Sequence, residues 1–302
     1  MKILIDPRGS YSYATYYIYG LEQVFGKESI SYDVNPFKNL EYASRRDLNS
    51  GMPIGPEFGI QLHGKAYTML LALHNYLRGR KSSARDLKEY MKIYCYSFVR
   101  RRKMDKFLEP VKEKENYIFH ASTLWYNEFA STNTNLYRGE FLKACAKAGI
   151  DIEGGLYYLG EAPYILKEMP DYAKYKTTYK DFIYTERLPI DEYIRKTKES
   201  IFVFNTPSVC GCHGWKLGEY LCMGKAIISS TLTRELPGPG LEHGKNVHFV
   251  SSPEEIYPAV CKLRDDDDYR RKLEENAKEY YKKYVSPESV ILRICQRLGI
   301  QI

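Results

Sequence analysis

The sequence predicts a mixed α/β fold made of two Rossmann-like lobes that face a cleft. Apolar runs of strand length alternate with segments of helical periodicity in both halves of the chain. The clearest unit, residues 201–230, reads strand, glycine-rich loop, helix and strand, which is the order that builds a parallel sheet. The length of 302 residues also suits two domains of about 100–200 residues each.

The N-terminal half opens as a strand, a turn, a helix and a second strand. We expect these elements over residues 2–6, 13–25 and 29–33, where short apolar runs flank a helical pattern. The first run is too short for a secretory signal peptide. The turn lacks G-x-G-x-x-G, so no dinucleotide site is predicted there, but Gly9 is expected to shape a pocket at the end of the first strand.

A third strand and two helices complete the predicted first lobe. The strand covers residues 57–62 and leads directly into His63, which is a candidate general base; the alternative is an ordinary loop histidine. The helices are expected over residues 66–77 and 84–107. The charged segment 109–115 is predicted as the linker, so the first lobe covers residues 1–114.

The second lobe is expected over residues 115–285, and the last helix, within 286–302, is expected to pack back on the first lobe. Its strands are predicted over residues 116–121, 150–158, 179–184, 201–204, 225–229 and 246–250. Its helices are predicted over residues 138–148, 189–198, 216–223 and most of 253–284. In such a lobe the ligand site lies at the carboxyl ends of the strands.

The composition is that of a globular protein with a mildly basic surface. It has 44% hydrophobic and 27% charged residues and a net charge of +7, which favours an anionic ligand or a membrane surface. No apolar run reaches the roughly 18 residues needed to cross a bilayer. The seven cysteines are an odd, scattered set, which suits the reducing cytoplasm. We therefore expect a cytoplasmic protein, with peripheral association at the inner face of the membrane as an open alternative.

Two other motifs suggest a metal site and a site for an acidic partner. The run Cys210-Gly211-Cys212-His213 suggests a metal site, but its C-x-C spacing differs from structural zinc and it has no second pair, so no metal is expected. The basic run 100–103 would suit acidic lipid or a charged acceptor, or would simply be a solvated face. No recognition motif accompanies this run, so nucleic acid is not expected as a partner.

Three residues of the second lobe have the chemistry of a phosphate and ribose site. Lys216 lies near the start of a predicted helix, where a cation suits a bound phosphate, and Glu219 lies one turn later, where a carboxylate suits ribose hydroxyls. An exposed, solvated Lys–Glu pair is the alternative for these two. Arg138 follows a Ser/Thr/Asn loop at the start of another predicted helix, so it would suit a diphosphate, or is a surface arginine.

The run KLGEYLCMGKAII, residues 216–228, resembles the donor-binding segment of GT-B glycosyltransferases, in particular the family 1 and family 4 group. The serines that follow, the Pro/Gly-rich loop, the H-G-K-N turn at 243–246 and the S-P-E-E start of a helix at 252–255 fit the same pattern. The resemblance covers roughly residues 116–284, and the motif is moderately specific.

The resemblance implies a metal-independent hexosyltransferase that uses a UDP- or GDP-linked sugar as donor and needs no cofactor. Glu219 matches the glutamate that binds the donor ribose, and Lys216 and Arg138 lie where basic residues neutralise the diphosphate. We also place His213, Gly214 and Gly9 in the donor site and take His63 as the catalytic base. The acceptor would be a glycan or a lipid-linked sugar, as in polysaccharide biosynthesis.

The sequence departs from the family pattern in two places. Family 4 enzymes carry a second glutamate eight residues before the one that Glu219 matches, and here Gly211 occupies that position. The first lobe is also short, which suggests a trimmed acceptor site. Two rival classes therefore stay open: a sugar-nucleotide epimerase, and a non-catalytic protein that keeps the fold and binds without transferring.

Overall fold

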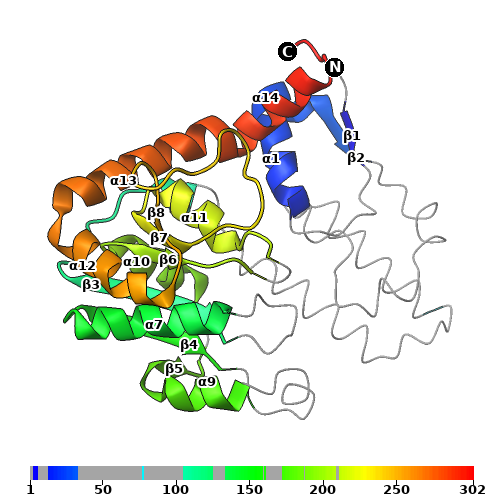
Figure 1. Cartoon of the computed structure of the whole chain (residues 1–302). Coiled ribbons are helices and arrows are strands. Elements are labelled where there is room, and N and C mark those ends of the chain that lie inside the picture. The colour runs from blue at the N-terminus through cyan, green and yellow to red at the C-terminus, as the bar shows by residue number, and fades with distance from the viewer. Residues whose placement is uncertain are drawn as a thin grey trace. The chain divides into compact units, whose positions relative to one another are not determined.

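We describe the chain from a computed structural model. The structure describes residues 3–5, 13–32, 77, 105–124, 133–158, 160, 172–186, 188–208 and 211–302. The chain divides into two compact units, one made of residues 1–102 with 286–302 and the other of residues 103–285 (Figure 1). Each unit is described by itself.

The first unit opens with the predicted strand–helix–strand pattern. Strand β1 (Ile3–Ile5) pairs in parallel with β2 (Ile30–Tyr32), and α1 (Tyr13–Phe25) and the short turn η1 (Lys27–Ser29) connect them. The C-terminal helix α14 (Pro287–Arg297) packs against α1 (Figure 1). The approach is close at Gly20, where an added Cβ would lie 2.4 Å from the carbonyl oxygen of Pro287.

The second unit contains two parallel three-stranded sheets. Strands β3 (Tyr117–Thr123), β4 (Asp151–Tyr157) and β5 (Ile183–Tyr184) form one, and β6 (Val203–Asn205), β7 (Ile227–Ser230) and β8 (His248–Val250) form the other. The sheets meet at β3 and β6, where the backbone N–H of Ile201 donates to the carbonyl oxygen of Tyr117 at 2.9 Å. Side by side, the strands therefore lie in the order β5-β4-β3-β6-β7-β8. The chain adds β4 and β5 on one side of β3 and β6 to β8 on the other, so the strand order changes direction between β3 and β6.

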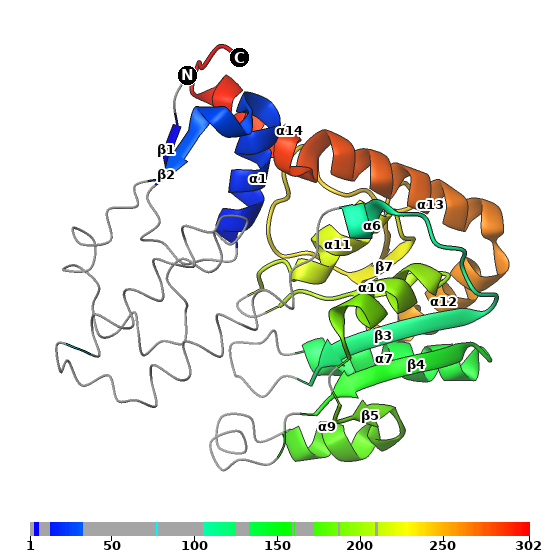
Figure 2. The same cartoon turned by 180° about the vertical axis from the view of Figure 1, so that it is seen from behind.

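Helices cover this sheet on both faces. They are α6 (Asp105–Leu108), α7 (Thr134–Lys147), α9 (Tyr172–Thr178), α10 (Ile190–Glu199), α11 (Trp215–Met223), α12 (Ile256–Asp265) and α13 (Asp267–Tyr280), with short turns η3 (Lys180–Phe182), η4 (Pro253–Glu255) and η5 (Tyr281–Val285). The two views show α7 and α10 on opposite faces (Figures 1 and 2). Helix α7 begins at Thr134, so the prediction that Arg138 starts this helix was wrong.

Two apolar clusters hold the helices onto the sheet. In the first, Phe141 of α7 stacks on Phe204 of β6 with ring centroids 4.5 Å apart, and both rings are buried. In the second, Leu217 and Leu221 of α11 are buried together with Ile227 of β7. Complete burial of such side chains contributes about 1.5–3 kcal/mol each. These contacts fix α7 and α11 at the carboxyl ends of β3 and β6.

The segment predicted as a linker lies within the second unit, since the division falls between residues 102 and 103. Buried lysines fasten this segment to the sheet. Lys225 Nζ forms an ion pair with Glu113 at 2.5 Å, and Lys198 Nζ donates to the carbonyl oxygen of Glu109 at 2.6 Å. No sequence pattern indicated these contacts, because the partners are far apart along the chain.

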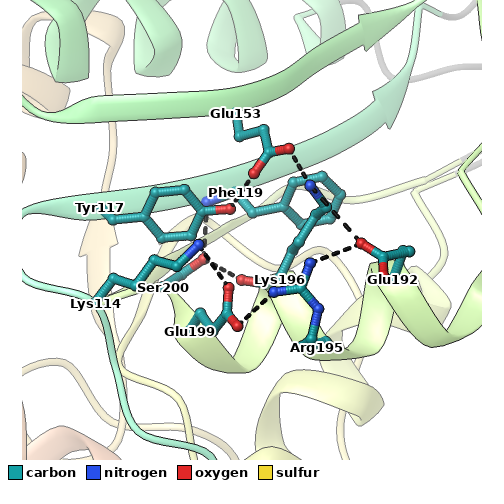
Figure 3. A network of polar contacts seen from close by, with 9 residues as sticks. All are labelled: Lys114, Tyr117, Phe119, Glu153, Glu192, Arg195, Lys196, Glu199 and Ser200. Carbon is teal, nitrogen blue, oxygen red and sulfur yellow. Dashed lines mark hydrogen bonds and ion pairs between the residues drawn. The ribbon is translucent and has the colours of Figure 1, made fainter.

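A polar network fastens α10 to β3 and β4 (Figure 3). Tyr117 donates to Glu153 at 2.7 Å, and Lys196 of α10 pairs with the other oxygen of the same carboxylate. Ser200, at the end of α10, accepts a hydrogen bond from the backbone N–H of Phe119 at 2.8 Å. Helix α10 therefore has a fixed position against the sheet, and this matters for the site because α10 carries Tyr193.

Candidate functional site

A pocket of about 190 Å³ lies at the point where the strand order reverses. The carboxyl ends of β3 and β6, the second turn of α7 and the first turn of α11 surround it. Its lining consists of Ala121, Ser122, Thr123, Arg138, Phe204, Asn205, Thr206, Ser208, Gly214 and Lys216. In open parallel sheets this reversal is where ligands bind, because the loops on its two sides diverge. We call it the cationic pocket.

Arg138 reaches this pocket from the second turn of α7 and is only 8% exposed. Its Nε donates to Thr206 Oγ1 at 3.0 Å, and its Nη1 donates to the carbonyl oxygen of Thr123 at 2.8 Å. Burial lowers the pKa of Arg138 to about 10, which still leaves the guanidinium charged at neutral pH. The pocket thus holds a fixed positive charge whose hydrogen-bond partners are neutral.

Lys216 enters the same pocket from the first turn of α11. Its Nζ donates to Ser122 Oγ at 2.8 Å and to the carbonyl oxygen of Ala121. Burial lowers the pKa of Lys216 to about 7, and the nearby charge of Arg138 adds to this effect, while Glu219 opposes it. Among the residues that the structure describes, no carboxylate forms an ion pair with Lys216 or Arg138.

His120 lies on β3 beneath these two cations. It is 2% exposed, and its ring contacts Phe141 and Phe204. Burial holds the pKa of His120 well below its ordinary value of 6.5, and the charges of Lys216 and Arg138 lower it further. His120 is therefore neutral at pH 7, so the positive charge of the pocket comes from Arg138 and from the protonated form of Lys216.

Glu219 lies one turn after Lys216 on α11 and accepts a hydrogen bond from Tyr193 Oη at 2.7 Å. Burial raises the pKa of Glu219, whereas the hydrogen bond from Tyr193 and the charge of Lys216 lower it. The sequence interpretation of Lys216 and Glu219 as an exposed pair on a solvated face does not hold, since both side chains are half-buried. Tyr193 fixes one carboxylate oxygen, and Glu219 is not among the residues that line the cationic pocket.

Gly211, in the glycine-rich segment before α11, has a backbone conformation that disfavours a side chain. This residue has φ +69°, and an added Cβ would lie 2.7 Å from Thr233 Oγ1, which itself donates to the Gly211 carbonyl oxygen at 2.6 Å. His213 contacts the carbonyl oxygen of Glu235 at 3.3 Å and does not line the cationic pocket. Gly214 does line it and precedes the first residue of α11.

The structure brings three of the predicted donor-site residues, Arg138, Lys216 and Gly214, to one pocket. His63 and Gly9 lie outside the described residues. The sequence did not indicate Thr206 or Tyr193 as members of the site. A signal for Thr206 exists, since it is a polar residue directly after a predicted strand, but Tyr193 stands in an ordinary amphipathic helix pattern.

Two features, a metal-binding cluster and a membrane-spanning helix, are absent from the part of the chain that the structure describes. No group of three or more His, Cys, Asp or Glu side chains is placed to hold a metal ion there. None of the helices in the described ranges combines the length and the apolar character that crossing a membrane requires.

The chain is similar in fold to solved structures of the GT-B glycosyltransferase type, among them HepE at a TM-score of 0.50. No family model matches the chain, and no curated protein matches it.

Among the similar structures is HepE from Anabaena in complex with UDP-glucose, which is 10% identical, with all of both chains covered and a TM-score of 0.50. The C-terminal domain of the group 1 family glycosyl transferase LpcC from Francisella tularensis is 15% identical; 61% of this chain and 97% of that domain are covered, at a TM-score of 0.41. TarM is 12% identical with a TM-score of 0.43, and the match covers 63% of this chain but 36% of TarM. At these identities the likeness shows the fold alone.

Proposed function

We propose that this protein is a glycosyltransferase that moves a hexose from a nucleotide-diphosphate sugar to a hydroxyl group of a glycan or lipid-linked acceptor. The observation that carries this proposal is the cationic pocket, where Arg138 and Lys216 lie together without a carboxylate partner among the described residues. Two buried cations repel each other, so the pocket gains free energy when an anion enters. A diphosphate has the charge and the oxygen acceptors that both side chains require.

The same two side chains have a role in the chemistry. When the bond between the sugar and the diphosphate breaks, negative charge develops on the leaving phosphate oxygen. Lys216 and Arg138 stabilise that charge by hydrogen bonds from inside a partly dehydrated pocket, where such contacts are stronger than in water. A nucleoside diphosphate then leaves without a metal ion.

Glu219 is the proposed contact for the ribose. Its carboxylate is held by Tyr193 on one oxygen, and the other oxygen accepts from a ribose hydroxyl. If the transfer inverts the configuration of the sugar, the base that activates the acceptor hydroxyl is the sequence candidate His63. HepE, one of the similar structures, has been solved with UDP and with UDP-glucose, which supports UDP as the first nucleotide to test before GDP.

A thermal-shift panel of UDP, GDP and their sugars tests the proposal. We expect UDP or GDP to raise the melting temperature, and the shift to be lost in Glu219→Ala. The matched control is Glu275→Ala on α13, an exposed glutamate that does not line the cationic pocket. No shift with any of these nucleotides would refute the proposed function.

One observation favours the non-catalytic alternative over the epimerase. Gly211, whose left-handed backbone disfavours a side chain, stands where the family carries its second carboxylate, so a protein that binds the donor without transferring its sugar fits the same pocket. Release of UDP from UDP-glucose in the presence of a glycan acceptor separates a glycosyltransferase from a non-catalytic binding protein. Binding without release would favour the non-catalytic protein.

A further inference from the structure

Tyr193 connects two helices of the second unit at the edge of the site. It belongs to α10, and its phenol donates to Glu219 of α11 at 2.7 Å. Glu219 lies outside the lining of the cationic pocket, about 4.5 Å further along the axis of α11 than Lys216. The group that is joined to a bound diphosphate is therefore about one helical turn away from this carboxylate.

The second carboxylate oxygen of Glu219 is accessible. Tyr193 donates to Oε2, and Oε1 has no hydrogen-bond partner among the residues that the structure describes. Nor does Oε1 belong to the enclosed, unpaired polar atoms of that part of the chain. An accessible carboxylate oxygen accepts hydrogen bonds from the hydroxyl groups of a ligand.

The phenol of Tyr193 is a fixed donor to this carboxylate. Burial raises the pKa of Tyr193 well above its ordinary value of 10, and Tyr220 and Glu219 raise it further, so the phenol keeps its proton at neutral pH. The same hydrogen bond opposes the rise that burial causes in the pKa of Glu219, and thus favours the charged form, which is the better acceptor. A carboxylate held in this way presents its second oxygen in one direction, which lowers the entropic cost of binding.

The sheet in turn holds Tyr193. Its ring meets the ring of Phe119 on β3 edge-on, with centroids 6.0 Å apart, and its backbone carbonyl oxygen accepts from the Thr197 hydroxyl at 2.7 Å. Lys196 and Ser200 fasten α10 to β4 and β3 (Figure 3). The direction of the Tyr193 hydroxyl is therefore set by the same sheet that carries the cationic pocket.

We propose that Tyr193 is a positioning residue that holds Glu219 in the orientation that binds ribose hydroxyls, and that it thereby makes the chain select ribonucleotides over dideoxyribonucleotides. This rests on the proposed function, in which Glu219 contacts the ribose. The alternative is a purely structural bond between α10 and α11, and its loss would weaken the binding of every nucleotide equally.

Calorimetry with UDP, GDP and their 2′,3′-dideoxy counterparts separates these two roles. All four ligands carry the same diphosphate, so contacts with Arg138 and Lys216 cancel in the ratio of affinities. We expect the wild-type chain to bind the preferred ribonucleotide at least about tenfold more tightly than its dideoxy counterpart, because the latter cannot donate to a charged acceptor. Tyr193→Phe should reduce this preference to about threefold or less and leave the affinity for the dideoxynucleotide unchanged.

A double-mutant cycle with Glu219 completes the experiment. Glu219→Ala should bind both nucleotides as weakly as the wild-type chain binds the dideoxy form, and adding Tyr193→Phe should change nothing further. Tyr179→Phe is the matched control, since Tyr179 is also a buried tyrosine that donates to a glutamate, Glu140, at 3.0 Å, and lies outside the lining of the cationic pocket. It should keep the wild-type preference. Melting curves of the unliganded variants set a temperature at which all of them are folded.

An undiminished preference in Tyr193→Phe would overturn the inference, as would equal losses for the ribonucleotide and the dideoxynucleotide. If Glu219→Ala keeps the wild-type preference, Glu219 does not contact the ribose, and the inference is refuted while binding of the diphosphate stands. If the wild-type chain binds none of the four nucleotides, the proposed function is refuted and the inference falls with it.

Discussion

Binding of a sugar nucleotide to the cationic pocket should be coupled to uptake of a proton by Lys216. Its pKa in the free protein is about 7, below the ordinary value of 10.5, because burial and Arg138 disfavour the charged form. The difference between these two pKa values corresponds to about 5 kcal/mol at 1.36 kcal/mol per pKa unit. This is the upper limit on the binding free energy that a diphosphate can gain by stabilising the charged form of Lys216. UDP-glucose is the suitable probe, since both of its phosphates are esterified and do not titrate near pH 7.

The sign follows from the lowered pKa. Below about pH 7 the free protein already carries the charged lysine, so the affinity for UDP-glucose is highest and independent of pH. Above pH 7 a proton has to be taken up on binding, and the affinity falls by about tenfold for each pH unit until the pKa of the complex is reached. His120 does not contribute, because its pKa lies well below 6.5.

Calorimetry at pH 8.5 in two buffers of different ionisation enthalpy measures the proton uptake directly. We expect close to one proton per UDP-glucose for the wild-type chain and none for Lys216→Met. At pH 6.5 the same variant loses one charged hydrogen-bond donor and should bind about 30-fold more weakly, which corresponds to about 2 kcal/mol. Lys216→Arg stays charged over this range and should bind without the pH dependence. Tight binding by wild type with no proton uptake at pH 8.5 would refute this reasoning.

Two further predictions concern stability in the second unit. Gly139→Ala should lower the free energy of unfolding by about 1–3 kcal/mol, because the new Cβ would lie 2.2 Å from the ring of Tyr179. Gly218→Ala in α11 has open space around its new Cβ and should raise the free energy of unfolding by about 0.5–1 kcal/mol. Urea unfolding of both variants measures these opposite changes, and changes of the same sign would contradict the packing. Lys225→Met should cost about 1–3 kcal/mol in the same assay, because it removes one of the two cations that pair with the half-buried Glu113 and leaves only Arg271, and adding Glu113→Gln should recover part of that loss. A double variant as unstable as the single one would contradict the buried ion pair.

The sequence predicted the alternating elements of the second unit because its strands are short apolar runs with clear breaks. Residues 201–204 and 225–229 were predicted as strands, and the structure has β6 and β7 at Val203–Asn205 and Ile227–Ser230. The start of α7 was missed by four residues, since Thr134 and Asn135 belong to types that are also common in loops. Element positions were therefore predictable to within a few residues.

The contacts of the site were less predictable. Lys216 and Glu219 were singled out as site candidates from the sequence, but their partners Ser122 and Tyr193 lie on other elements of the fold and could not be predicted. The conformation of Gly211 has no signature in one sequence, because glycine also occurs in turns that tolerate a side chain. His213 has the chemistry of a ligand contact, and in the structure its ring contacts the Glu235 carbonyl oxygen outside the lining of the cationic pocket. Local pattern indicates which residue types are available, and tertiary contacts decide which of them face a pocket.

The central claim is that Arg138 and Lys216 together hold the diphosphate of a sugar nucleotide. A crystal structure of the chain with UDP-glucose tests it most directly. The account predicts phosphate oxygens within hydrogen-bond distance of both the Arg138 guanidinium and Lys216 Nζ, at the carboxyl ends of β3 and β6. A bound nucleotide whose phosphates lie elsewhere, with the contacts of Lys216 to Ser122 and the Ala121 carbonyl oxygen unchanged and its Nζ free of phosphate, would contradict it.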